Sequence, residues 1–94
     1  RGREGNRDRV RATYARAKAF IEHVVRYASR PSGTHWEFLH EVKPMIEGFE
    51  PNLRALTLLY EVAEYSNYPC SIEDSEQAIS EAEAIFHDLG KKLE

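Results

Sequence analysis

Residues 53–66 have the sequence LRALTLLYEVAEYS, in which large apolar side chains recur every three or four positions. That spacing is the period of an α-helix with one buried face, and no strand-like alternation competes with it. The predicted inward face consists of Leu53, Leu56, Leu59, Tyr60 and Ala63. We therefore expect a helix over residues 52–67 whose apolar stripe packs into a helical core.

Two segments before this stretch have the same period. Over residues 7–29, apolar side chains follow one another at steps of three or four, from Val10 to Ala28. Residues 34–47 begin with Thr34-His35-Trp36-Glu37, the pattern of a capping box, in which the Thr34 side chain and the Glu37 side chain bond each other's backbone N–H groups. Pro44 lies within this segment and should kink or shorten the helix because it cannot donate a backbone hydrogen bond.

A fourth helix is predicted over residues 71–92. Ser71 is a favourable N-cap, and the acidic side chains of Glu73 and Asp74 suit the first turn of a helix. Its predicted inward face consists of Ile72, Ser75, Ile79, Ala82, Phe86, Leu89 and Leu93.

These four segments predict an all-α fold. The connections between them are short, which favours antiparallel neighbours and a compact antiparallel four-helix domain over residues 7–94. Residues 1–6 contain two glycines and no core residue, so we expect them to form a flexible basic leader. The chain of 94 residues is long enough for one domain, and its single cysteine excludes an internal disulfide bond.

Charge is divided unevenly along the chain. The first 30 residues have a formal charge of +6 and the remaining 64 a charge of −9. Such an asymmetry points to a negatively charged neighbour, which can be nucleic acid, lipid headgroups or the acidic part of the same domain. The arginines concentrated at the start of the chain are Arg1, Arg3, Arg7, Arg9 and Arg11.

Of these neighbours, anionic lipid fits the pattern best. Nucleic acid is disfavoured, because the basic residues are not spread over a face with base-stacking side chains among them, and the acidic remainder would repel phosphates. Positive charge instead collects on the cytoplasmic side of a membrane-spanning segment. The chain begins without methionine, and we expect it to be part of a longer, membrane-anchored protein. Docking of the basic flank of the first helix on the acidic helices is compatible with this interpretation, and a protein partner remains open.

One constellation suggests a metal site. Glu37 and His40 form a Glu-x-x-His pair, and Glu83 and His87 lie four residues apart on the last predicted helix. Di-metal bundles use two such pairs with further glutamates, whereas here there is only one Glu-x-x-His copy. We therefore interpret these residues as exposed helix flanks. We expect no metal, no cofactor and no catalytic residues, and keep a small metal-binding or enzymatic domain as the alternative.

The cysteine and the tyrosines have simple packing interpretations. Cys70 precedes a helix start, where a thiol can have a lowered pKa, but no base is placed beside it and a small apolar core residue is the favoured role. Tyr60, Tyr65 and Tyr68 cluster near the end of the third helix. We expect them to pack in the core with their hydroxyl groups at its rim.

Three segments together resemble a known family. They are residues 10–21, residues 31–38 (PSGTHWEF), and the stretch quoted at the outset followed by Ser71-Ile72-Glu73-Asp74. The family is the C-terminal domain of unknown function found in bacterial and archaeal multi-pass membrane proteins, often after a transglutaminase-like domain. Its helix-start motif T-P-x-E-[YF] and its L-T-x-L-Y-E-x-A-R-Y motif are matched here except that His35 replaces proline and Glu64 replaces arginine. The matching positions include Thr34, Glu37, Leu56, Leu59, Tyr60, Ala63 and Tyr65.

The resemblance implies a cellular location for the domain, and it implies no catalytic activity within this chain. It implies a helical domain that follows a transmembrane segment, on the cytoplasmic side of the cell membrane, and any transglutaminase activity would belong to residues upstream of this chain. The combined hypothesis is a non-enzymatic helical interaction or regulatory module at the cytoplasmic face of a membrane protein. A nucleic-acid-binding module is the weakest alternative.

Overall fold

The computed structural model describes residues 2–25, 33–46 and 48–93, and this part of the chain contains four α-helices and no strand. They are α1 (Gly2–Val25), α2 (His35–Val42), α3 (Glu50–Tyr65) and α4 (Ile72–Leu93), and a short 3-10 helix, η1 (Lys43–Met45), follows α2. The predicted all-α class is confirmed. None of the helices in the described ranges combines the length and apolar character needed to cross a bilayer.

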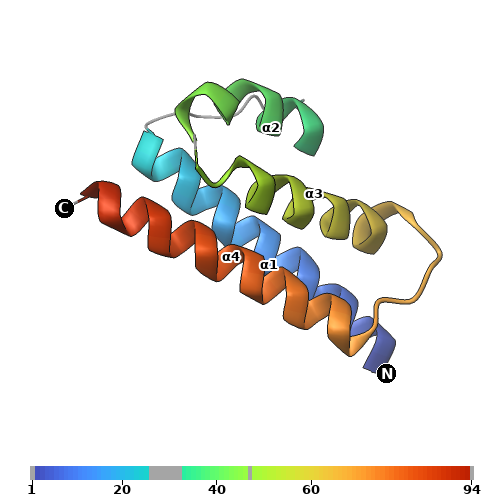
Figure 1. Ribbon diagram of the computed structural model, residues 1–94. Helices are drawn as coiled ribbons and strands as arrows, with labels where there is room; N and C mark the ends of the chain where they lie inside the picture. Colours follow the sequence, from blue (N-terminus) through green and yellow to red (C-terminus); the bar gives the residue numbers. More distant parts are fainter. Residues whose placement is uncertain (1, 26–32, 47, 94) are drawn as a thin grey trace.

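The long helices α1, α3 and α4 pack around one core, and the short α2 lies on the side of α3 that faces away from α4 (Figure 1). Helix α3 runs antiparallel to α1, because Arg7 contacts the end of α3 whereas Tyr14 stacks on Tyr60 one turn earlier. Helices α1 and α4 run parallel, since Asn6 bonds Cys70 and Phe20 contacts Phe86. The expected antiparallel packing is therefore observed between α3 and its neighbours α1 and α4, whereas α1 and α4 are parallel to each other. Because α2 packs on α3, α4 takes the place beside α1 and points in the same direction.

The ends of α2 follow the local sequence closely. Thr34 caps α2 with the predicted box: its Oγ1 accepts the Glu37 backbone N–H at 3.1 Å, and the Glu37 carboxylate accepts the Thr34 N–H at 2.8 Å. Pro44 shortens the helix as expected, because α2 ends at Val42 and the chain tightens into η1, with the proline in its first turn. A left-handed Gly48 (φ 101°) then turns the chain toward α3.

The other boundaries differ modestly from the predictions. Helix α1 already begins at Gly2 and so includes most of the expected leader, and its predicted end at residue 29 lies outside the described residues. Helix α3 begins at Glu50, because Pro51 fits the first turn of a helix, where its missing N–H costs nothing. Helix α4 begins one residue after Ser71, whose Oγ accepts the Asp74 N–H at 3.1 Å and whose N–H donates to the Asp74 carboxylate at 3.0 Å.

The core is formed largely by the predicted faces. Val10, Tyr14, Ala17 and Ile21 of α1 are buried, as are Leu53, Leu56 and Ala63 of α3, while Leu59 and Tyr60 are half-buried. On α4 the buried stripe is rotated relative to the prediction. Ala78 and Ile85 join Ser75, Ala82 and Leu89 inside, whereas Ile79 and Phe86 lie at the edge and Ile72 is exposed; nothing is described for the Leu93 side chain.

Candidate functional site

The four residues considered as a metal site do not converge. Glu37 and His40 of α2 line a small pocket of about 320 Å³ with Trp36 and Glu41, whereas Glu83 lines a groove between α1 and α4. His87 lies 3.7 Å from the carboxylate of its own neighbour, Asp88. Within the ranges that the structure describes, no group of three or more His, Cys, Asp or Glu side chains is arranged to hold a metal ion.

Arg7 caps the end of α3. Its guanidinium donates to the backbone carbonyl oxygens of Val62 (3.5 Å), Ala63, Ser66 (3.2 Å) and Tyr68 (2.9 Å). The last carbonyl groups of a helix have no partner within that helix, and they carry the negative end of its dipole. A planar cation with several N–H donors can bond these carbonyl groups and also neutralise the negative end of the dipole. Arg7 therefore links the start of α1 to the end of α3.

The other N-terminal arginines divide into two groups. Arg11 faces α3 as well: it pairs with Asp8 at 2.5 Å on its own helix and approaches the Glu64 carboxylate to 3.8 Å. Arg9 is exposed on the side of α4 and lines the groove named above. Arg1 and the side chain of Arg3 lie outside the described residues. The contacts of Arg7 and Arg11 agree with docking of the basic flank on the rest of the domain.

An aromatic and imidazole cluster joins the start of α2 to α3. The His35 Nε2 atom lies 3.1 Å from Oε1 of Glu61, which also accepts a hydrogen bond from the Trp36 indole. The His35 ring packs edge-on against Tyr60 (5.2 Å between centroids) and stacks on Tyr65 (5.7 Å). The hydrogen bond from Trp36, followed by that from His35, holds the pKa of Glu61 below its ordinary value.

Tyr14 continues this cluster into the core. Its ring stacks on Tyr60 with 4.3 Å between centroids, and its hydroxyl, fully buried, makes no hydrogen bond of normal geometry within the described structure. Burial raises the pKa of Tyr14 well above its ordinary value, and the neighbouring Tyr60 adds to the shift. Burial also raises the pKa of Tyr60, to which the Glu64 carboxylate contributes. Both phenols are therefore neutral at neutral pH.

Two of the three tyrosines contradict the packing prediction. Tyr65 and Tyr68 are 71% and 76% exposed, so only Tyr60 packs against the core. The rotation of α4 leaves Ile72 54% exposed as well. Leu58 and Val62, on the same face of α3 as Tyr65, are also exposed. Tyr65 is in the last turn of α3, where it contacts the His35 ring, and Tyr68 lies beyond that turn in the connection to α4.

Tyr65 ends α3, Tyr68 lies in the connection that follows, and Ile72 begins α4, all at the end of the molecule where α1 begins. The connection between α3 and α4 is held against α1 by Arg7 and by Asn6, whose Nδ2 donates to the Cys70 carbonyl at 3.3 Å. Figure 1 shows the chain start beside the first turn of α4 at this end of the molecule. Cys70 itself is buried, in agreement with the expected role as a small core residue.

Sequence reasoning missed the contacts that organise this end. A polar side chain that bonds a backbone carbonyl some 55 to 65 positions away leaves no periodic signal, and Arg7 and Asn6 are both of this kind. The His35–Glu61–Trp36 link was also missed. Comparison of the chain with protein-family models, with curated proteins and with solved structures found no match, so the family resemblance remains an expectation.

Proposed function

We propose that this chain is a non-enzymatic helical interaction module at the cytoplasmic face of a membrane-anchored parent protein. The observation that carries the proposal is the end of the molecule where α1 begins, which exposes Tyr65, Tyr68 and Ile72. A chain that leaves a bilayer just before Arg1 would enter the domain at this end. The three exposed side chains would then lie nearest to the lipid.

The chemistry of this end suits a membrane interface. Tyrosine rings are enriched at the level of lipid headgroups because they combine an apolar body with a polar tip. Arginines of the basic leader favour anionic lipid, each by about 1 kcal/mol near the surface. Glu73 is exposed in the first turn of α4 at the same end, and its carboxylate opposes that attraction. The proposal therefore predicts opposite effects for the removal of a tyrosine and the removal of this acid.

Vesicle sedimentation tests the lipid contact. The domain is mixed with vesicles of phosphatidylcholine alone or of phosphatidylcholine with phosphatidylserine. We expect stronger binding to the anionic vesicles, weaker binding for Tyr68→Ser and Ile72→Ser, and stronger binding for Glu73→Gln. Met45→Ser is the matched control, because Met45 is exposed in η1, near the opposite end of α3. Equal binding to both vesicle types, or none, would refute the lipid contact.

Anchoring is tested separately, in the parent gene. An apolar run of about 20 codons immediately upstream of Arg1 is expected, because that length spans the hydrocarbon core of a bilayer. A hydrophilic upstream sequence would refute the anchored setting and would leave the interaction role of the exposed end to be tested on soluble partners.

A further inference from the structure

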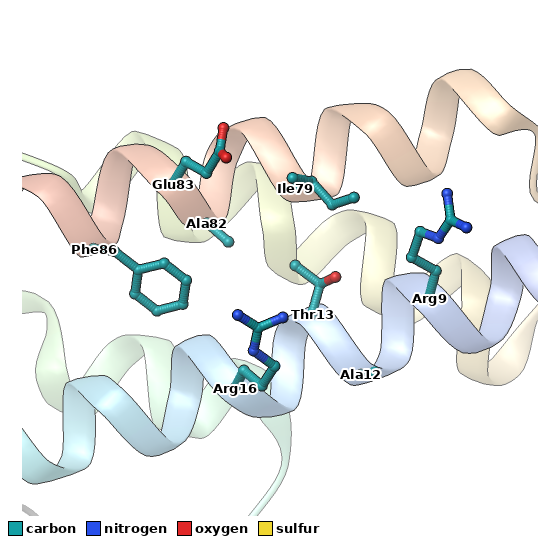
Figure 2. A pocket seen from close by; sticks show the side chains of 8 residues that line it. All are labelled: Arg9, Ala12, Thr13, Arg16, Ile79, Ala82, Glu83 and Phe86. Carbon is teal, nitrogen blue, oxygen red and sulfur yellow. The ribbon is translucent and has the colours of Figure 1, made fainter.

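Helices α1 and α4 enclose a groove of about 510 Å³ on the side of the molecule away from α3. Figure 2 shows Arg9, Thr13 and Arg16 projecting from α1 toward α4, and Phe86 projecting from α4 toward α1. The middle of the groove is apolar, with Ala12, Ile79, Ala82 and Phe86 among its lining residues. An apolar middle with charged margins is the general composition of a protein interface.

The charges on the two margins are of opposite sign and equally spaced. Arg9 and Arg16 lie seven residues apart on α1, and both line the groove. On α4, Glu83 lines the groove, and Glu76, seven residues earlier, lies on the same face of the helix by its spacing. Seven residues are two helical turns, or about 10 Å. All four side chains belong to exposed residues, and none of them forms an ion pair within the described part of the chain. The Arg16 guanidinium lies 6.0 Å from the centre of the Phe86 ring.

The parallel direction of α1 and α4 places these charges at matching levels. Contacts between the two helices join residues that are 64 to 70 positions apart in the sequence: Asn6 with Cys70, Phe20 with Phe86, and Arg16 with Phe86. Glu76 follows Arg9 by 67 positions, and Glu83 follows Arg16 by the same number, in the middle of that range. Each arginine therefore lies level with one glutamate, across the groove.

We propose that this face binds a second copy of the same chain about a two-fold axis that runs along the groove. Such an axis lays α1 of each copy on α4 of the other, parallel and at the same level. Arg9 then meets Glu76 of the second copy, Arg16 meets Glu83 of the second copy, and each pair occurs twice. A face that carries both partners of every pair is self-complementary, as a closed dimer requires.

Charge complementarity selects this axis over the alternative. A two-fold axis in the same plane but perpendicular to the helices would lay α1 on α1 and α4 on α4, with like charges opposed. Side-chain size agrees with the proposed arrangement. Ala12 and Ala19 are small and exposed on α1, and at the levels given above they lie opposite Ile79 and Phe86 of the second copy. Small residues on one helix and large apolar residues on the other permit close approach. The dimer does not depend on the membrane setting proposed above.

Charge exchange between two variants tests the proposal. Arg16→Glu and Glu83→Arg should each weaken self-association roughly tenfold or more, because each change turns two attractions into two repulsions. When the two variants are mixed, the glutamate introduced at position 16 of one chain faces the arginine introduced at position 83 of the other. The unchanged Glu83 of the first chain then faces the unchanged Arg16 of the second. The mixture should therefore form a one-to-one heterodimer with near wild-type affinity, as should the doubly exchanged chain with itself. Sedimentation velocity distinguishes monomer from dimer for each single variant, for the mixture and for the doubly exchanged chain.

The outcomes separate the proposal from its alternatives. Arg54→Glu is the matched control, because it makes the same charge change at an exposed position of α3 and should leave association unchanged. A wild-type chain that stays monomeric up to about 0.3 mM would overturn the proposal. So would single variants that dimerise as well as the wild type, or a mixture that does not associate. Circular dichroism melts of the single variants show that any loss of association occurs in folded protein.

Discussion

Replacement of Arg7 with methionine should destabilise the domain by about 2–4 kcal/mol. The guanidinium donates to four carbonyl oxygens at and just beyond the end of α3, those of Val62, Ala63, Ser66 and Tyr68. A hydrogen bond with a charged donor contributes on the order of 1.5–3 kcal/mol, and a cation at a helix C-terminus adds roughly 0.3–1 kcal/mol. Because the four bonds share one half-buried side chain, their contributions do not add, and we count one strong hydrogen bond and the dipole interaction.

Thermal unfolding followed by circular dichroism measures this effect. In a domain of this size, 1 kcal/mol corresponds to a shift in Tm of roughly 4–8 °C, so Arg7→Met should lower Tm by roughly 8–32 °C. Arg9→Met is the control, because Arg9 is exposed two residues away on the same helix and should change stability by less than about 0.5 kcal/mol. If the two variants melt together with the wild type, Arg7 does not cap α3. If both are destabilised alike, helix charge rather than the cap is responsible.

Three further predictions concern the core and the aromatic cluster. Leu56→Ala should cost about 2–5 kcal/mol in urea unfolding, because Leu56 is fully buried, and the half-buried Leu59→Ala should cost less. Tyr14→Phe should leave Tm unchanged or raise it, because the buried hydroxyl makes no hydrogen bond of normal geometry; a clear loss would show that its interaction with the Thr57 side chain of α3 stabilises the fold. The folded-state pKa of Glu61 is lowered, so its contribution to stability is complete above the unfolded pKa, near 4.5, and is lost as pH falls through the folded pKa. Trp36 fluorescence should report that change, and Glu61→Gln should abolish it.

Local sequence patterns were sufficient to predict the helices. The Thr34–Glu37 box, the Ser71 cap and the shortening at Pro44 depend on residues three or four positions apart, so they can be read directly from the sequence. The buried faces of α1 and α3 followed for the same reason, because each has a single apolar stripe. Fold class and most of the core were therefore predictable without tertiary information.

The rotation of α4 was not predictable in this way. Its sequence contains two overlapping apolar stripes, one that includes Ala78 and Ile85 and one that includes Ile72, Ile79 and Phe86. Periodicity favours neither, and the choice depends on which neighbours surround the helix. Because α2 lies on α3 and leaves one side of the α1–α4 pair uncovered, the second stripe stays at the edge of the groove.

The direction of the proposed two-fold axis connects the two proposals. An axis parallel to the helices keeps the direction of every helix, so the two copies present the ends that carry Tyr68 and Ile72 on the same side of the dimer. Two chains anchored in one bilayer can then associate without either leaving it. The rejected perpendicular axis would point the two N-terminal ends in opposite directions, which one membrane does not permit. Of the arginines on α1, Arg7 and Arg11 bind α3, and Arg9 and Arg16 line the groove. Dimer contacts therefore do not compete with the cap on α3, and Arg16→Glu should dissociate the dimer while Tm of the monomer stays unchanged.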